Sequence, residues 1–221
     1  EDALIRVSNL SLPVDGDLEQ LKKRAARELG IRPGQVGELE LLRQSIDARR
    51  KDELHYVYTV GLTLPDEAAV VRAAPGKHVD RVERRAYELP RPRRSSSLPP
   101  VVVGMGPGGL FAALTLARMG LKPIVLERGR PVEERTEDVE HFWRTGQLSR
   151  SSNVQFGEGG AGTFSDGKLT TGTHDPRISA VLDALIQAGA PADVRYSHKP
   201  HIGTDVLRQV VASMRREILS L

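Results

Sequence analysis

The chain of 221 residues is long enough for one large domain or two small ones, since a domain typically takes ~100–200 residues. Its 32 Lys and Arg residues against 29 Asp and Glu residues leave a net charge of +3, which argues against a strong nucleic-acid-binding surface. With 39% hydrophobic residues the chain can form a real core, and global disorder is excluded. The sequence has no cysteine, which excludes disulfides, thiolate metal sites and a dithiol redox relay in these residues.

The apolar runs of the sequence are all shorter than the ~20 residues that cross a bilayer. Residues 1–12 also lack the basic start and the apolar stretch of a signal peptide. We therefore expect a cytoplasmic protein that does not bind membranes.

Residues 1–89 carry short segments in which apolar residues alternate with polar ones. Together with β-branched and aromatic content, this alternation predicts strands at residues 3–8, 38–46 and 54–64, and a fourth near residues 82–89. Between the first two strands a helix is expected, with Asp17 as its cap, Gly30 as its end, and one apolar face made of Leu18, Leu21, Ala25 and Leu29.

A shorter helix is expected to start at Pro65 and Asp66, with an apolar face of Ala68, Val71 and Ala74. The resulting order β-α-β-β-α-β predicts a small ferredoxin-like α+β domain over residues 1–89. The basic segment at residues 48–52 is predicted to be a hairpin turn, and an anion-binding site is the alternative. Residues 90–100 are rich in Pro, Arg and Ser and are predicted to be a linker.

Residues 101–221 show helical periodicity and clusters of glycine. A strand at residues 98–103, a helix and a strand at residues 123–126 form a predicted β-α-β unit. The apolar face of that helix consists of Leu110, Ala113, Leu114 and Ala117, and Gly120 ends it. Three more amphipathic helices are expected around Val139, after the cap Asp175, and after the cap Thr204.

A glycine-rich turn carries the strongest functional signal. Gly104, Gly106 and Gly109 fit the pattern G-x-G-x-x-G between a strand and a helix, and Glu127 ends the next strand about 20 positions on. The first glycine allows a tight turn, the second lets the backbone approach a pyrophosphate, and the third lets the helix pack closely on the sheet. The helix N-terminus adds unpaired N–H groups for the phosphates. The predicted cofactor-binding residues of the turn are Gly104, Met105, Gly106, Pro107, Gly108 and Gly109.

Glu127 is predicted to accept hydrogen bonds from ribose hydroxyls, and its charge would repel a 2′-phosphate. NAD or FAD is therefore favoured over NADP. The turn does not separate FAD from NAD, because both share the ADP half. A glycine-rich connector without a ligand is the alternative.

A second glycine cluster lies in residues 153–169, with Phe156 and Phe164 as flanking aromatic residues. So much backbone freedom is costly to order, so we expect this loop to press against a flat or phosphorylated ligand, with a mobile surface loop as the alternative. Its candidate cofactor-binding residues are Gly159, Gly160, Ala161, Gly162, Thr163, Phe164 and Ser165.

Longer stretches are more specific than the single fingerprint. They are VVVGMGPGGLFAALTLA, VLERG, VEHFW, SNVQFGEGGAGTFSDGKLTT and KPHIGTD in the second half, with SIDARRK and residues 54–60 in the first. Together they resemble the uncharacterised FAD-dependent, or NAD/FAD-utilising, dehydrogenases that carry an N-terminal ferredoxin-like extension.

This resemblance implies a non-covalently bound FAD in a Rossmann-type α/β domain of the glutathione-reductase superfamily. The three fingerprint glycines would lie at its pyrophosphate, Glu127 at its adenosine ribose, and the loop of residues 159–168 beside the pyrophosphate and the isoalloxazine ring. Arg128 and Arg135 are further candidates near the adenosine and the phosphates. NAD(P)H would be the electron donor, and the substrate is not implied.

Smaller signals concern Lys168, Asp166 and two histidines. A lysine near the flavin could stabilise negative charge on the reduced ring, and a loop-closing Asp-Gly turn with an exposed lysine is the alternative. His198 and His201 lack neighbouring ligands and are expected to be structural or solvated, so no metal site is predicted. Phe142 and Trp143 are expected in the core.

The sequence thus predicts an FAD-dependent oxidoreductase that passes on a hydride. A dehydrogenase that uses NAD alone is the first alternative. The second is an RNA- or protein-binding N-terminal module, supported by Arg49, Arg50, Arg91, Arg93 and Arg94, although its tyrosines do not follow the pattern of RNA-binding sheets. Because residues 101–221 supply only two of the five or six strands of a doubly wound fold, we expect about half of the Rossmann part in this chain.

Overall fold

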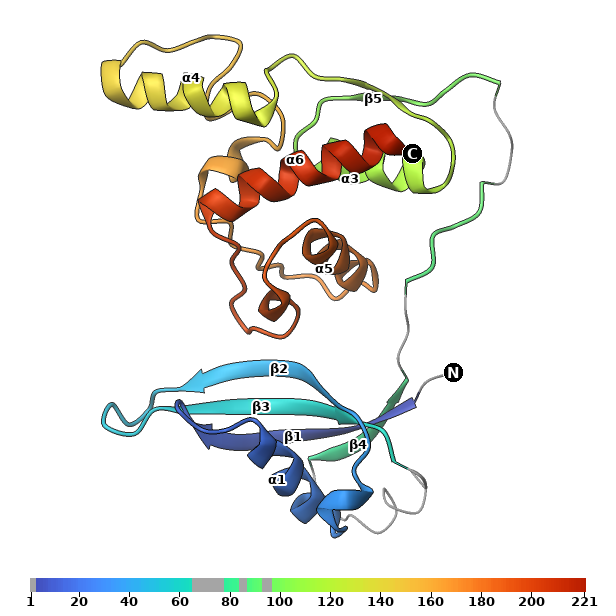
Figure 1. The fold of residues 1–221 in the computed structure, drawn as a ribbon, viewed down its shortest axis with the longest axis vertical. Helices are drawn as coiled ribbons and strands as arrows, with labels where there is room; N and C mark the ends of the chain where they lie inside the picture. Colours follow the sequence, from blue (N-terminus) through green and yellow to red (C-terminus); the bar gives the residue numbers. More distant parts are fainter. Residues whose placement is uncertain (1–2, 65–77, 84–86, 93–96) are drawn as a thin grey trace. The chain divides into compact units, whose positions relative to one another are not determined.

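The computed structural model describes residues 3–64, 78–83, 87–92 and 97–221 (Figure 1). The chain divides into two compact units. The first consists of residues 1–86 and 195–200, and the second of residues 87–194 and 201–221. The predicted boundary at residue 89 lies close to the observed one. The predicted continuity of residues 101–221 differs from the structure, because residues 195–200 belong to the first unit.

The first unit contains a four-stranded antiparallel sheet. Its strands are β1 (Ala3–Pro13), β2 (Leu39–Asp47), β3 (His55–Leu62) and β4 (Val79–Glu83), in the spatial order β2-β3-β1-β4. β3 lies between β1 and β2 and is antiparallel to both, so β1 and β2 run in the same direction. This order supports the ferredoxin-like proposal, whose second helix, predicted from residue 65, falls outside the described residues.

Two strands differ from their predicted bounds. β1 continues to Pro13 instead of ending at residue 8, because Asn9 takes a positive φ of 64° and the pairing with β3 shifts register between Val7 and Leu10. This bulge interrupts the alternation on which the prediction rested and lets the strand continue. β4 begins at Val79, earlier than predicted.

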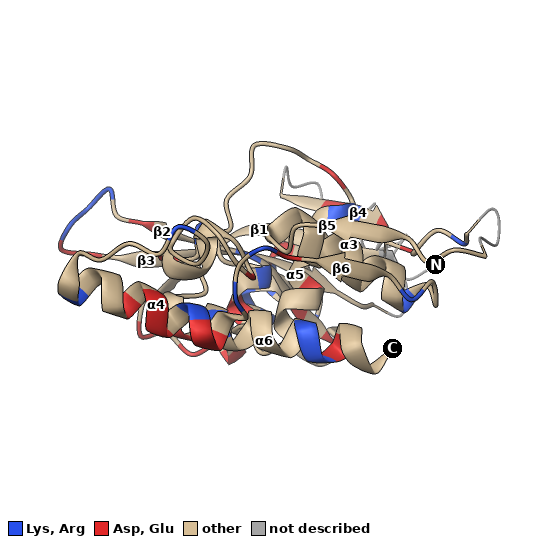
Figure 2. Cartoon of the chain, turned by 90° about the horizontal axis from the view of Figure 1, so that it is seen from above, with Lys and Arg blue, Asp and Glu red and all other residues tan. Residues whose placement is uncertain are grey.

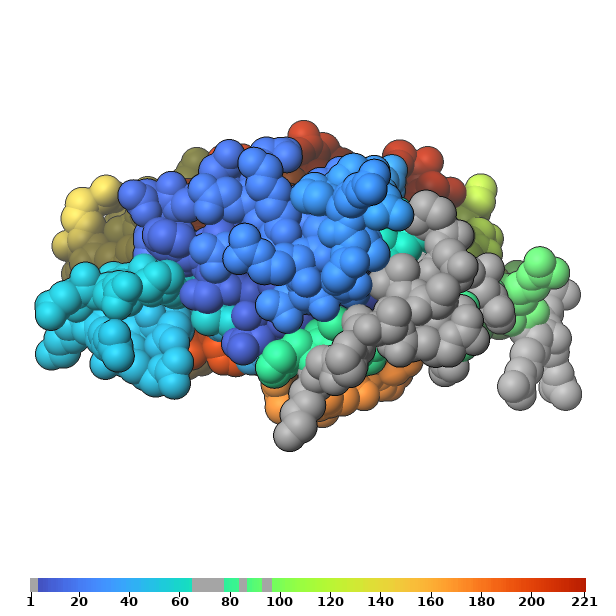
Figure 3. Space-filling model, turned by 90° about the horizontal axis from the view of Figure 1, so that it is seen from below, coloured from blue at the N-terminus to red at the C-terminus, as the bar shows by residue number. Residues whose placement is uncertain are grey.

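Helix α1 (Glu19–Leu29) covers one face of this sheet (Figures 1 and 3). Leu18 takes the cap position in place of the predicted Asp17, whose Oδ1 still accepts the N–H of Glu19 at 3.0 Å, and the helix ends at the left-handed Gly30 as predicted. The predicted face is confirmed apart from Leu18, which is 49% exposed because it precedes the helix. The core between α1 and the sheet includes Ile5, Val7, Leu12, Leu21, Ala25, Leu29, Val60 and Leu62.

The predicted basic turn connects β2 to β3, and its arginines and lysine lie at the tip of the hairpin (Figure 2). Arg49 pairs with Asp47 and lowers the pKa of that carboxyl to about 2, and Arg50 lies 3.6 Å from Glu53. These arginines therefore pair with acidic residues of their own turn, which favours a solvated turn over an anion site.

The second unit begins with the predicted β-α-β arrangement. β5 (Val101–Val103) and β6 (Ile124–Leu126) pair in parallel, and α3 (Pro107–Arg118) connects them. The buried residues of α3 are the four that the periodicity predicted. Three further helices follow, α4 (Val132–Thr145), α5 (Arg177–Gln187) and α6 (Thr204–Ser220). The described residues also form short 3-10 turns at η1 (Pro33–Gln35), η2 (Ala161–Phe164) and η3 (Ala192–Arg195).

The core of the second unit lies where α6 packs against α3, α4 and η2. Met105 and Leu114 meet Val210, Val211 and Met214 in this core. By contrast, alternate residues of the two short strands are exposed, and Val103 is the most exposed of them at 81%. Parallel sheets are normally covered on both faces. A Rossmann-type fold for this unit therefore remains a proposal that rests on the β-α-β arrangement.

Two side chains of the second unit differ from their predictions. Trp143 was expected in the core but is 59% exposed, because α4 buries Val132, Arg135 and Val139 on its other side, and Phe142 is half-buried. Thr204 does not cap α6, since Gly203 takes the cap position. Instead its hydroxyl donates to the carbonyl of Ser165 at 2.7 Å.

The turn between β5 and α3 yields a stability prediction for two neighbouring glycines. A Cβ on Gly109 would overlap the carbonyl oxygen of Gly104, whereas a Cβ on Gly108 would meet nothing within 4 Å. Gly109→Ala should therefore lower the free energy of unfolding of the second unit by about 2 kcal/mol or more. Gly108→Ala should leave it unchanged or raise it by up to about 1 kcal/mol, through higher helix propensity. Urea unfolding of both variants checks this, and equal stabilities would contradict it.

Candidate functional site

The turn from β5 into α3 presents backbone donors at a helix N-terminus. Gly104 has a φ of 92°, and its N–H donates to the carbonyl of Leu126 at 2.7 Å. Gly106 caps α3 in an extended conformation, and its carbonyl accepts the N–H of Leu110 at 2.9 Å. The N–H groups of Gly108 and Gly109 lie in the first turn, where a helix supplies no acceptor of its own. The turn can therefore donate to an anion at the positive end of the helix dipole.

The glycines of this turn have different roles. Gly109 is required by the fold, as shown above. A Cβ on Gly106 would meet only the Cα of Gly160, at 4.0 Å, so the chain leaves room for a Cβ there. Internal packing therefore does not explain why residue 106 is a glycine. The approach of a ligand to the backbone of this residue does explain it.

Glu127 follows β6 and connects two turns. Its Oε2 accepts the N–H of Met105 at 2.6 Å, and its Oε1 accepts the N–H of Gly129 at 2.7 Å. The side chain is half-buried. A carboxylate has about four acceptor positions, so it can still accept from hydroxyl groups after these two bonds.

The structure brings the second glycine cluster against the first. The N–H of Gly159 donates to the carbonyl of Met105 at 2.7 Å. A Cβ on Gly160 would lie 2.8 Å from Cδ of Pro107 and 3.3 Å from the Cα of Gly106, closer than side chains allow. Gly129 and Gly157 are in similarly close backbone contact. The glycines of the loop thus permit close packing of the loop on the chain itself. The sequence predicts contact of the same glycines with a ligand.

The other predicted loop residues differ in exposure. Thr163 is buried, Phe164 is half-buried against Trp143, and Ala161, Gly162 and Ser165 are exposed. The loop is therefore docked at Gly159 and Gly160 and presents the backbone around residues 161–162 to solvent.

The two candidate arginines lie in different environments. Arg128 is exposed, and its guanidinium lies 3.9 Å from the ring centroid of Phe156. Arg135 is fully buried in α4 and donates to three carbonyl oxygens of the loop, those of Asn153 (2.9 Å), Val154 (2.7 Å) and Glu158 (2.6 Å). The structure therefore gives Arg135 a role in holding the loop, and its contact with a cofactor stays a prediction.

Glu158 is a site residue that the sequence analysis missed. It is 2% exposed, its Oε2 accepts the N–H of Val132 at 2.7 Å and lies 3.3 Å from Nη1 of Arg215, and its Oε1 has no hydrogen-bond partner. Burial raises the pKa of this carboxyl. A signal in the sequence is that Glu158 is an acidic residue among the glycines of the segment GEGG. A charged side chain in a segment of otherwise small residues indicates a specific contact.

Lys168 and Asp166 form an exposed ion pair with Nζ and Oδ2 2.8 Å apart. This pairing lowers the pKa of Asp166 and raises that of Lys168. The carbonyls of Asp166 and Gly167 accept the N–H groups of Gly203 and Ile202, which closes the loop. This geometry matches the loop-closing alternative, and a catalytic role of Lys168 stays a prediction.

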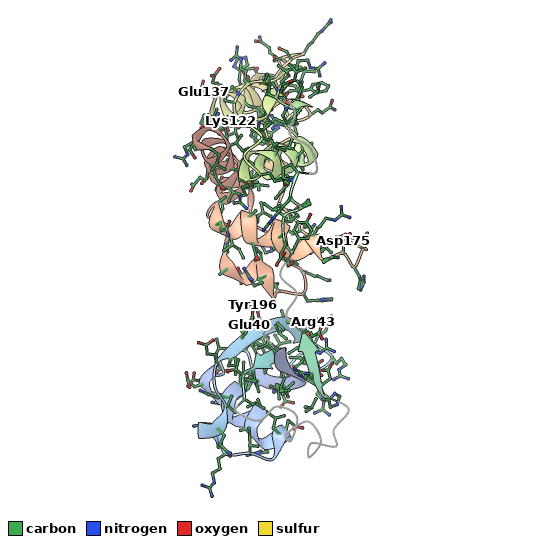
Figure 4. All side chains as sticks on the ribbon, turned by 90° about the vertical axis from the view of Figure 1, so that its right-hand side faces the viewer. Glu40, Arg43, Lys122, Glu137, Asp175 and Tyr196 are labelled. Atoms are coloured by element: carbon green, nitrogen blue, oxygen red, sulfur yellow. The ribbon has the colours of Figure 1, made fainter. Side chains whose placement is uncertain are left out.

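Residues 195–200 extend the edge of the first unit's sheet at β2. Tyr196 is labelled beside β2 in Figure 4. The N–H of Gln44 donates to the carbonyl of Tyr196 at 2.7 Å, and the N–H of His198 donates to the carbonyl of Gln44 at 2.9 Å. The ring Nδ1 of His198 lies 3.0 Å from Nη2 of Arg43. Within the described ranges, no group of three or more His, Asp or Glu side chains could hold a metal ion.

Comparison with known proteins gives two matches. A family model described as a domain of unknown function (DUF8436) matches residues 4–63, which span β1, α1, β2 and β3. An uncharacterized protein from Clostridium beijerinckii is 47% identical over 218 residues, or 98% of this chain. The chain spans 41% of the length of that relative. In the described part of the chain, no helix has the length and apolar character needed to cross a membrane.

The three hydrogen bonds of Arg135 yield a prediction about stability. Arg135→Lys keeps the charge but cannot serve three separate carbonyls, so it should lower the free energy of unfolding of the second unit by about 2–4 kcal/mol. Arg144→Lys on the exposed side of the same helix is the control, with an expected change within about 0.5 kcal/mol. Denaturant unfolding measures both, and similar values would contradict the buried role of Arg135.

The raised pKa of Glu158 yields a prediction about pH. The folded chain retains a proton on this carboxyl at pH values where the unfolded chain has released it, so this group's contribution to stability falls as pH rises from the ordinary glutamate range through the raised value. Glu158→Gln removes this contribution. Relative to wild type, the unfolding free energy of the variant should therefore rise as the pH increases above the ordinary glutamate range. A difference that does not change with pH would contradict the raised pKa.

Proposed function

We propose that the chain binds FAD, with the ADP part of the cofactor at the turn from β5 into α3, and that it serves an FAD-dependent oxidoreductase. The observation that carries the proposal is the assembly of three features at one place. They are an accessible helix N-terminus at Gly106–Gly109, an acceptor at Glu127, and a glycine loop docked on the same turn at Gly160.

The residues present fit the ADP part of the cofactor. The N–H groups of Gly108 and Gly109 would donate to the pyrophosphate, and Glu127 would accept from ribose hydroxyls. The backbone of residues 161–162, exposed beside this turn, supports the proposed position of the loop along the cofactor. FAD would supply the hydride-transfer chemistry, with NAD(P)H as the proposed electron donor.

The preference for FAD over NAD rests on the resemblance of the glycine-loop and fingerprint stretches to FAD-dependent dehydrogenases. The β-α-β arrangement and the antiparallel sheet of the first unit support the Rossmann-type and ferredoxin-like parts of that resemblance. A cytoplasmic location is part of the same proposal.

Titration of the purified chain with FAD, and separately with NADH, tests the proposal. We expect saturable quenching of flavin fluorescence by the chain and weaker or undetectable binding of NADH. Binding of NADH with no binding of FAD would assign the turn to NAD alone. Failure of both to bind would contradict the proposal.

Gly106→Val gives this test a site-specific form. The fold tolerates a Cβ at this position, so loss of binding would report on access of the ligand to the backbone. We expect FAD affinity to fall by about a factor of ten or more, with an unchanged midpoint of thermal unfolding. Gly172→Val, in an exposed loop with no atom near its Cβ, is the control. Unaltered affinity of Gly106→Val would place the pyrophosphate elsewhere.

A further inference from the structure

Glu158 lies at the junction of three elements of the second unit. Its carboxylate binds the first turn of α4 through the N–H of Val132 and lies 3.3 Å from Arg215 of α6. Its backbone N–H donates to the carbonyl of Arg130 at 3.3 Å, and its carbonyl accepts from the buried Arg135. Few side chains of the described unit are as completely enclosed.

This carboxylate is expensive to bury. A carboxyl that reaches one N–H and one guanidinium, with its second oxygen unpartnered, recovers only part of its lost hydration. Burial also raises its pKa. A charged residue that is held at such a cost is better explained by the geometry it imposes than by the stability it adds.

The imposed geometry concerns the next two residues. The N–H of Gly159 bonds to Met105, and Gly160 contacts Gly106 and Pro107 with no room for a side chain. Both contacts require the loop to lie directly against the turn. Because Glu158 immediately precedes them and is fixed by α4 and α6, it sets the position from which they reach the turn.

We propose that Glu158 is a positioning residue for the cofactor site, which fixes Gly159 and Gly160 against the turn at Met105–Pro107 and so keeps the N-terminus of α3 in the shape that a dinucleotide phosphate requires. The ligand in this inference rests on the proposed function, whereas the fixing of the loop rests on the contacts of Glu158 alone. Glu133 provides a contrast, because it pairs with the same Arg215 at 2.5 Å but its side chain is 59% exposed and it belongs to α4 rather than to the loop.

Hydrogen exchange of the amides of residues 159–164 and FAD affinity, measured on the same variants, test this inference. Glu158→Ala removes the acceptor, so we expect loop amides to exchange at least tenfold faster and FAD affinity to fall at least tenfold. Glu158→Gln keeps an oxygen that can accept from Val132 and Arg215, so both quantities should remain within about threefold of wild type. Glu133→Gln, the control, should change neither.

Two results would overturn the inference. One is wild-type exchange in the loop of Glu158→Ala. The other is a Glu158→Gln variant that loses FAD as strongly as Glu158→Ala while its loop stays protected, because Glu158 would then contact the ligand directly. If Glu158→Ala does not fold, Glu158→Asp replaces it. Its shorter side chain keeps the charge but cannot reach Val132, so the loop should still exchange faster, and unchanged exchange would again overturn the inference.

Failure of the proposed function has a different signature. If the wild-type chain binds neither FAD nor NADH, the affinities of the variants cannot be compared with it. Hydrogen exchange of the loop amides in the Glu158 variants then still decides whether this residue positions the loop. If the wild type binds FAD and the variants show no change in loop exchange, the function stands and the positioning role is wrong.

Discussion

The second unit depends on close contact between two glycine-rich backbone segments. The turn after β5 and the loop before η2 approach until Gly160 contacts Gly106 and Pro107, and a hydrogen bond joins Gly159 to Met105. A side chain at Gly160 would hold the segments apart, since packed interiors leave no free space of that size. Pro107 and Gly108 at the start of α3 remain exposed beside this contact.

Buried charge holds this contact in place. Arg135 donates to the carbonyls of Asn153, Val154 and Glu158 and so fixes this part of the loop. The side chain of Glu158 connects the loop to α4 and α6. Glu127 performs a similar task for the turn, with its two oxygens on Met105 and Gly129. A glycine-rich segment loses much conformational entropy on ordering, so charged hydrogen bonds of this strength are a reasonable means to offset that loss.

The sequence predicted the regular elements well where hydrophobic period and capping agree. The buried face of α3, the end of α1 at Gly30 and the parallel pairing of β5 with β6 followed from local patterns. The fingerprint predicted which turn lies at a helix N-terminus. The ferredoxin-like, Rossmann and FAD assignments remain predictions that these local features support.

What the sequence did not predict depends on contacts between distant residues. The bulge at Asn9, the exposure of Trp143 and the pairing of residues 195–200 with β2 carry no periodic signal. The burial of Glu158 and Arg135 runs against the usual preference of charged residues for the surface, so only the packed structure shows it. The sequence predicts that the glycines of residues 157–160 lie against a ligand, which stays a prediction, whereas the structure shows them packed against the chain itself.

The most direct test of the central claim is the pattern of backbone amide NMR shifts on titration with FAD. If the cofactor binds where the two glycine segments meet, the largest changes should appear at Gly106–Gly109 and Gly159–Gly162, with none in the sheet of the first unit. Changes confined to other residues, or no changes on addition of excess FAD, would contradict the account.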